Sequence, residues 1–148
     1  MRKQVCITLL CLLTIGGFIA ERVYKTSWVT RVENDVSKNF NVEVTGTSQV
    51  DAGGSSGNKL LYITIRPRQS SGGIALIEKS VITSLSQNKW KMSGPNVLVK
   101  DSIAVEVWTC EHLGNLVSSD RTMNLYVPNS VRQFCQSTNG LVVRAAQI

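Results

Sequence analysis

The side chains best suited to nucleophilic catalysis or metal binding lie in the C-terminal third of the chain: Cys110, Glu111, His112 and Cys135. A cysteine close to a histidine can act as a nucleophile, and Cys, His and Glu side chains all bind zinc. His112 is the only histidine of the chain, and a thiolate held in a disulfide is unavailable for attack. We therefore predict no catalytic residue, no metal site and no cofactor.

We interpret Cys110 and Cys135 as a disulfide, because no other cysteine follows residue 20 and the N-terminus indicates export to an oxidising compartment. Closing a loop of about 25 residues contributes ~3–4 kcal/mol in the chain-entropy model. Cys110 follows a predicted strand, and Cys135 falls in a short helix predicted after Pro128. Two unpaired buried thiols remain the alternative.

Two other segments are better candidates for binding a partner protein than for catalysis. Asp51, Gly53 and Gly54 begin the Gly- and Ser-rich loop 51–58, and His112 lies in a polar segment, 111–120, that we predict to be a surface loop. The glycine-rich loop lacks the Lys-Ser/Thr pair of a P-loop and precedes a strand rather than a helix. We therefore interpret both segments as candidate partner-contact loops.

The N-terminus has the pattern of an export or membrane signal. Residues 5–20 carry no charge and follow Arg2 and Lys3. As a helix they would span about 24 Å, less than the roughly 30 Å hydrocarbon core of a bilayer. We predict that residues 1–20 are either a signal-anchor or a cleaved signal peptide, with membrane contact through residues 5–20.

The rest of the chain predicts a stem and one domain. Val29, Val32 and Val36 recur at helical spacing, so residues 21–40 are expected to form an amphipathic stem helix. Residues 41–148 then form an extracytoplasmic α+β domain, with a mixed or antiparallel sheet and helices packed on one face. We expect its core to contain a strand stripe and a helix stripe, formed by Leu61, Ile63, Ile65, Ile77, Val81 and Leu85.

Local patterns place the elements of this domain. The expected strands cover 41–49, 59–66, 89–92, 97–100, 103–109, 123–127 and 141–146. The expected helices cover 74–87 and a short segment after Pro128.

Charge and motifs limit the function classes. The net charge of +6 is spread along the chain without the basic cluster that nucleic-acid binding needs, so no nucleic-acid partner is predicted. We expect a non-enzymatic, single-pass envelope protein that binds other envelope proteins, as a minor component of a secretion, pilus or surface assembly, with oligomer formation left open. The alternative is a secreted, disulfide-containing binding module, an inhibitor or effector, released by signal cleavage. A small envelope hydrolase is the third reading.

Overall fold

The computed structural model describes residues 28–39, 41–52, 59–68, 73–120 and 126–148. The chain divides into two compact units, residues 1–32 and 33–148. Of the first unit only residues 28–32 are described, and they are helical. The predicted membrane segment and the first part of the predicted stem lie outside the described residues. Within the described ranges, no helix is both long and apolar enough to cross a membrane.

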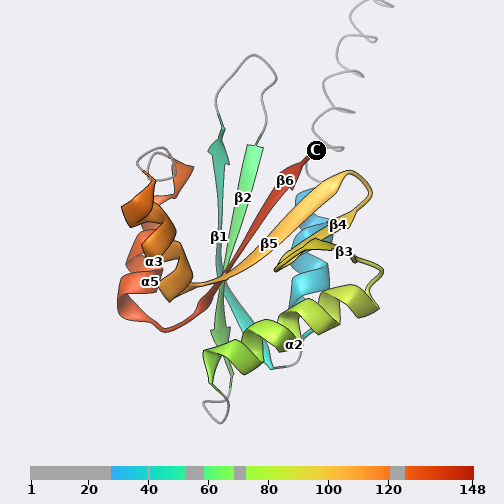
Figure 1. The fold of residues 1–148 in the computed structure, drawn as a ribbon, viewed down its shortest axis with the longest axis horizontal. Coiled ribbons are helices and arrows are strands. Elements are labelled where there is room, and N and C mark those ends of the chain that lie inside the picture. The colour runs from blue at the N-terminus through green and yellow to red at the C-terminus, as the bar shows by residue number, and fades with distance from the viewer. Residues whose placement is uncertain (1–27, 40, 53–58, 69–72, 121–125) are drawn as a thin grey trace, which may run out of the picture. The chain divides into compact units, whose positions relative to one another are not determined.

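In the second unit, the described strands form one antiparallel sheet in the order β1-β2-β6-β5-β4-β3 (Figure 1). The strands are β1 (Val42–Asp51), β2 (Lys59–Pro67), β3 (Lys91–Gly94), β4 (Val97–Lys100), β5 (Ile103–Thr109) and β6 (Leu141–Gln147). The predicted mixed α+β class is confirmed, and the sheet is of the antiparallel kind.

Two of the antiparallel pairs join strands that the sequence predicted, at 41–49 and 59–66 and at 97–100 and 103–109. β1 and β2 pair from Val42 opposite Pro67 to Asp51 opposite Lys59, with a register shift between Val44 and Gly46. β4 and β5 pair through a two-residue turn whose Asp101 and Ser102 both have positive φ, as a type I′ turn requires.

Helix α2 (Ile74–Gln87) has the predicted bounds, and the amide hydrogen bonds of a Schellman motif close its C-terminus. Trp90 N donates to Leu85 O, and Lys89 N donates to Ser86 O. Lys89 occupies the left-handed position with φ of 69°. The buried Trp90 follows directly, so the end of α2 also fixes an aromatic side chain in the core.

Helix α3 (Cys110–Ser119) replaces the surface loop predicted for residues 111–120, and that prediction is wrong. Thr109 caps the helix by accepting a hydrogen bond from the amide of His112 at 3.0 Å. Cys110 and Leu113 are buried on its inner side. Their spacing is helical, but the polar residues between them obscured it in the sequence.

Helix α5 (Asn129–Ser137) is the short helix predicted after Pro128. The strand predicted for residues 123–127 falls mostly outside the described residues, and Val127 is not in a strand. Gly140, between α5 and β6, has no room for a side chain. A Cβ atom there would lie 2.5 Å from the Phe134 ring and 2.8 Å from the carbonyl oxygen of Ile65.

Both faces of the central strands are covered. On one face the strand residues pack with α3 and α5 in a cluster of buried side chains: Leu60, Tyr62, Trp108, Cys110, Leu113, Val127, Val131 and Val142. Because side chains alternate along a strand, the neighbouring residues point to the other face. These are also buried: Leu61, Ile63, Ile65, Val105, Val107, Leu141 and Val143.

Helix α2 belongs to the second face. Its buried residues are Ile77, Val81 and Leu85, and it contacts β4 and β5. Figure 1 shows α3 and α5 beside each other and apart from α2. The predicted burial of the two stripes is thus confirmed, but the prediction that the helices pack on one face is wrong. The cause is visible in β2, whose run of buried residues from Leu60 to Ile65 is the pattern of a strand covered on both sides.

Candidate functional site

The disulfide predicted between Cys110 and Cys135 is present and joins the first residue of α3 to α5. The two Cα atoms are 5.1 Å apart, and the residues are 25 positions apart in the chain. Cys110 is buried, whereas Cys135 is half-buried and packs at the margin of the same cluster. The bond therefore holds the two helices of one face together, and neither thiol is free for nucleophilic chemistry.

The predicted contact residues Asp51 and His112 lie at opposite ends of the sheet. His112 is exposed in the first turn of α3, directly after the Thr109 end of β5. Asp51 is at the other end. It pairs with Lys59 at the start of β2, whereas Thr109 pairs with Leu141 at the start of β6. Because β2 and β6 are antiparallel, their starting residues lie at opposite ends of the sheet. The structure therefore does not bring these two residues into one site. Gly53 and Gly54 lie outside the described residues.

His112 has an aromatic neighbour, Trp108. Its ring centroid lies 6.4 Å from that of Trp108, with the planes tilted by 54°. Across the described ranges, no group of three or more His, Cys, Asp or Glu side chains is arranged to hold a metal ion.

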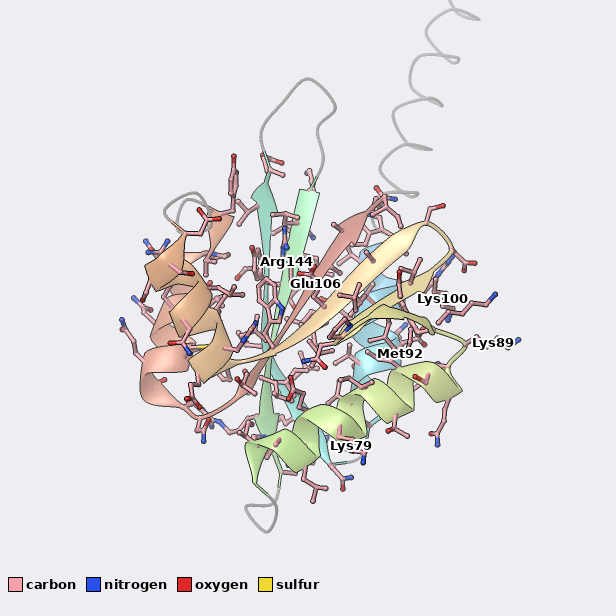
Figure 2. The ribbon with its side chains drawn as sticks, viewed as in Figure 1. Lys79, Lys89, Met92, Lys100, Glu106 and Arg144 are labelled. Carbon is pink, nitrogen blue, oxygen red and sulfur yellow. A yellow bond between two sulfur atoms is a disulfide. The ribbon has the colours of Figure 1, made fainter. Side chains whose placement is uncertain are left out.

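A charged pair that sequence reasoning missed lies on the α3 side of the sheet. Glu106 of β5 and Arg144 of β6 are register partners, and Arg144 Nη1 lies 2.9 Å from Glu106 Oε2 (Figure 2). The Arg144 guanidinium also lies 5.5 Å from the centroid of the Trp108 ring. The two charged side chains are 30% and 26% exposed, so this pair marks a partly open area of the sheet. Only the strand order brings these residues together, and no local motif signals it.

Tyr62 stands on the other side of Arg144, as its register partner in β2. Its hydroxyl oxygen and Arg144 Nε are buried and have no hydrogen-bond partner among the described residues. Burial raises the pKa of Tyr62, and the positive charge of Arg144 opposes that rise. The phenol therefore stays protonated, and at 1% exposure it is out of reach of a substrate.

A second network surrounds the buried Asp35, in the helical residues 33–37. Its carboxylate accepts hydrogen bonds from Lys38 Nζ at 2.8 Å, Lys100 Nζ at 2.9 Å and Trp90 Nε1 at 3.0 Å. Desolvation alone would raise the pKa of Asp35, but the hydrogen bonds from Lys38, Lys100 and Trp90 outweigh it and lower the pKa. A carboxylate held in this way is a structural anion rather than a general base.

A shallow hollow lies beside α2, lined by Lys38, Asn39, Asn41, Leu76, Lys79, Ser80, Thr83, Ser84 and Gln87. Its amides bond within the hollow, since Asn39 Nδ2 donates to Ser80 Oγ at 3.0 Å and Asn41 Nδ2 at 3.4 Å. The lining contains no acid, histidine or cysteine. The hollow therefore offers no carboxylate, imidazole or thiol group for catalysis.

The two edges of the sheet differ in a way that bears on contact with partners. β3 has only four residues, carries Lys91, and has a register break between Met92 and Gly94. Short length, lysine and irregularity are the features that protect edge strands from pairing. β1 has ten residues without lysine, arginine or proline, and no described strand pairs with its outer side. It is the less protected edge.

Comparison with protein families, with curated proteins and with solved structures gives no match for this chain.

Proposed function

We propose that the chain is a non-enzymatic envelope protein whose extracytoplasmic domain, residues 41–148, binds other proteins. It would be a minor component of a secretion, pilus or surface assembly, held at the membrane through residues 5–20. The observation that carries the compartment is the Cys110–Cys135 disulfide, because such bonds persist in oxidising compartments.

Two further observations support binding over catalysis. The acidic side chains Asp35 and Glu106 are both engaged, since Asp35 accepts three hydrogen bonds and Glu106 pairs with Arg144. The surface instead offers a long edge strand, β1, of the kind that proteins use to pair with a partner strand.

The alternative is a secreted binding module released by cleavage of the signal. It shares the disulfide and the edge strand and differs only in the fate of residues 1–20. Cell fractionation with intact-mass measurement separates the two: a membrane fraction that retains residue 1 supports the anchored form, and a shorter soluble form supports the secreted one.

The compartment is tested by thiol alkylation of the denatured, unreduced chain followed by peptide mapping. We expect Cys110 and Cys135 to remain unlabelled until a reductant is added. Cys6 and Cys11, in the apolar segment, serve as internal controls for labelling. Full labelling of Cys110 and Cys135 without reductant would remove the case for an oxidising compartment.

The binding role is tested by photo-crosslinking in cells at three surface positions. A photo-reactive residue is placed singly at Thr47 on β1, at Met92 on β3 and at Lys79 on α2. We expect a defined protein adduct at one or more of these positions, but not at all three equally. Identical, diffuse labelling at each position would count against a specific protein partner.

A further inference from the structure

The Cys110–Cys135 disulfide borders an open hollow in the surface. The hollow measures about 400 Å³, and both cysteines line it. A small molecule in solution can therefore approach the bond from this side without any described element having to move. The other residues that line the hollow are all polar: Glu111, Gln136, Ser137, Thr138 and Asn139.

The two cysteines differ in how far they are exposed. Cys110 is 7% exposed and belongs to the buried cluster beneath α3 and α5. Cys135 is half-buried and packs only at the margin of that cluster. The rate of attack on a disulfide depends on access to the sulfur that is attacked. A nucleophile that enters the hollow therefore meets Cys135 more readily than Cys110.

The positions of the two cysteines in their helices differ in the same sense. Cys110 is the first residue of α3, whereas Cys135 lies in the last turn of α5. A helix carries partial positive charge at its N-terminus and partial negative charge at its C-terminus. A thiolate is therefore favoured at Cys110 over Cys135, which makes Cys110 the better leaving group when the bond is broken.

Charges of both signs lie at the hollow. Glu111 lines it, and Arg66 Nη2 donates at 3.5 Å to Oγ1 of Thr138, another of its lining residues. Because these two charges are of opposite sign, we expect no strong selection for a charged thiol. The amide and hydroxyl groups of the lining suit a small, polar, peptide-like molecule.

We propose that Cys135 is a thiol–disulfide exchange site for small, peptide-like thiols. The thiolate of the entering molecule attacks Cys135 Sγ, the bond to Cys110 Sγ breaks, and its electron pair leaves with Cys110 as a thiolate. The products are a mixed disulfide on Cys135 and a free Cys110, so the entering thiol is the only co-reactant. In the reverse direction, Cys110 attacks Cys135 Sγ and expels the small thiol, which restores the native bond.

The test uses the folded, full-length chain in detergent, with glutathione as the thiol. Free thiols, among them Cys6 and Cys11, are first blocked with N-ethylmaleimide. Glutathione is added without denaturant, samples are quenched with acid, and mass mapping of peptides locates the adduct. We expect glutathione on Cys135 with Cys110 free, about tenfold more often than the reverse arrangement.

A matched pair of variants tests whether the hollow is the route of entry. Ser137, the last residue of α5, lines the hollow, and Ser119, the last residue of α3, does not. Both are exposed, and each hydroxyl donates to the carbonyl oxygen three residues earlier. Ser137→Trp should fill the hollow and slow the exchange about fivefold, because exchange requires access to the sulfur. Ser119→Trp should keep the parent rate, and all three chains should react alike in denaturant.

The distribution of the adduct in the parent chain decides the proposal even if a variant fails to fold. Equal amounts of glutathione on the two cysteines, a majority on Cys110, or an adduct that forms only in denaturant would each overturn it. Equal rates in folded Ser137→Trp and Ser119→Trp would also overturn it. The proposed function is judged separately, because these results depend neither on residues 1–20 nor on a protein partner.

Discussion

The indole Nε1 of Trp90 donates a hydrogen bond of 3.0 Å to Oδ2 of Asp35, although the two residues are 55 positions apart. The same oxygen accepts from Lys100 Nζ, which in turn lies 5.6 Å from the centroid of the Trp90 ring. Lys100 also donates to the carbonyl oxygen of Asn88, just after α2. One buried carboxylate thus links the helical residues 33–37, the end of α2 and strand β4.

Replacing Asp35 with Asn should lower the free energy of unfolding by about 2–3 kcal/mol, because it removes the charge that Lys38 and Lys100 neutralise. Chemical denaturation at neutral pH measures this loss. The control is Lys38→Gln, which should cost less than about 1 kcal/mol because the Lys38 side chain is 56% exposed. Equal losses in the two variants would contradict the central position of the carboxylate.

The same carboxylate predicts how stability depends on acid. Because the pKa of Asp35 is lowered from its usual 3.8, the folded chain binds fewer protons than the unfolded chain at and below that pH. Its stabilising contribution is therefore complete above pH 3.8 and is lost as the pH falls toward the folded-state pKa. The Asp35→Asn variant should show a shallower acid loss than the parent chain, and parallel curves would exclude this role.

We expect Lys89→Gly to raise the free energy of unfolding, whereas a Lys→Gly substitution inside α2 should lower it. Lys89 holds φ of 69° at the C-terminus of α2, where a side chain is strained and glycine is not. Lys89→Gly is expected to raise the free energy of unfolding by about 0.5–1 kcal/mol. Lys79→Gly, in the exposed middle of α2, should lower it by about 1 kcal/mol. Thermal unfolding of both variants, with opposite shifts in Tm, checks the pair.

Gly140 and Gly114 form a similar pair for alanine. At Gly140 a methyl group would meet the Phe134 ring and the backbone carbonyl of Ile65, so Gly140→Ala should lower the free energy of unfolding by about 1–3 kcal/mol. At Gly114, inside α3, a methyl group meets nothing within 4 Å, and Gly114→Ala should raise the free energy by about 0.5–1 kcal/mol. A neutral result at Gly140 would show that α5 can move away from β6.

Sequence reasoning succeeded where one local pattern decides an element. The stripe of Ile77, Val81 and Leu85 at helical spacing located α2, and the alternation along β5 located that strand. The disulfide was predictable because only two cysteines remain after the N-terminal segment. In α3 the spacing of Cys110 and Leu113 and the cap at Thr109 were available signals, but Gly114 and the polar residues between them favoured a loop.

The networks could not be predicted, because they depend on strand order rather than on spacing. Arg144 meets Glu106 on one side and Tyr62 on the other only because β6 lies between β5 and β2. Asp35 contacts Trp90 and Lys100 only through the tertiary fold, since these residues are 55 and 65 positions away in the chain. The two-sided covering of the sheet also follows from topology, although the largely apolar run Leu60–Ile65 in β2 was a local signal of it.

Tyr62 provides the sharpest test of the packing beneath α3 and α5, because its buried hydroxyl has no hydrogen-bond partner among the described residues. Tyr62→Phe removes a desolvated group without removing a bond, so the free energy of unfolding should stay the same or rise by up to about 1 kcal/mol. The matched control is Thr64→Val on the same face of β2. Thr64 Oγ1 accepts from Thr45 Oγ1 at 3.0 Å and donates to the Gly46 carbonyl at 3.2 Å, so this change should cost about 1–2 kcal/mol.

The alkaline limb of the stability curve gives an independent readout for Tyr62. Burial raises its pKa above the usual 10.0, so near and above that pH the folded chain retains a proton that the unfolded chain loses. The contribution of Tyr62 to stability is therefore complete below pH 10.0 and is lost as the pH rises through the folded-state pKa. Tyr62→Phe should remove this part of the alkaline loss, whereas Thr64→Val should retain it. A loss of more than about 1 kcal/mol in Tyr62→Phe at neutral pH would instead mean that the hydroxyl makes a bond in solution, with Arg144 Nε as the adjacent group that shares it.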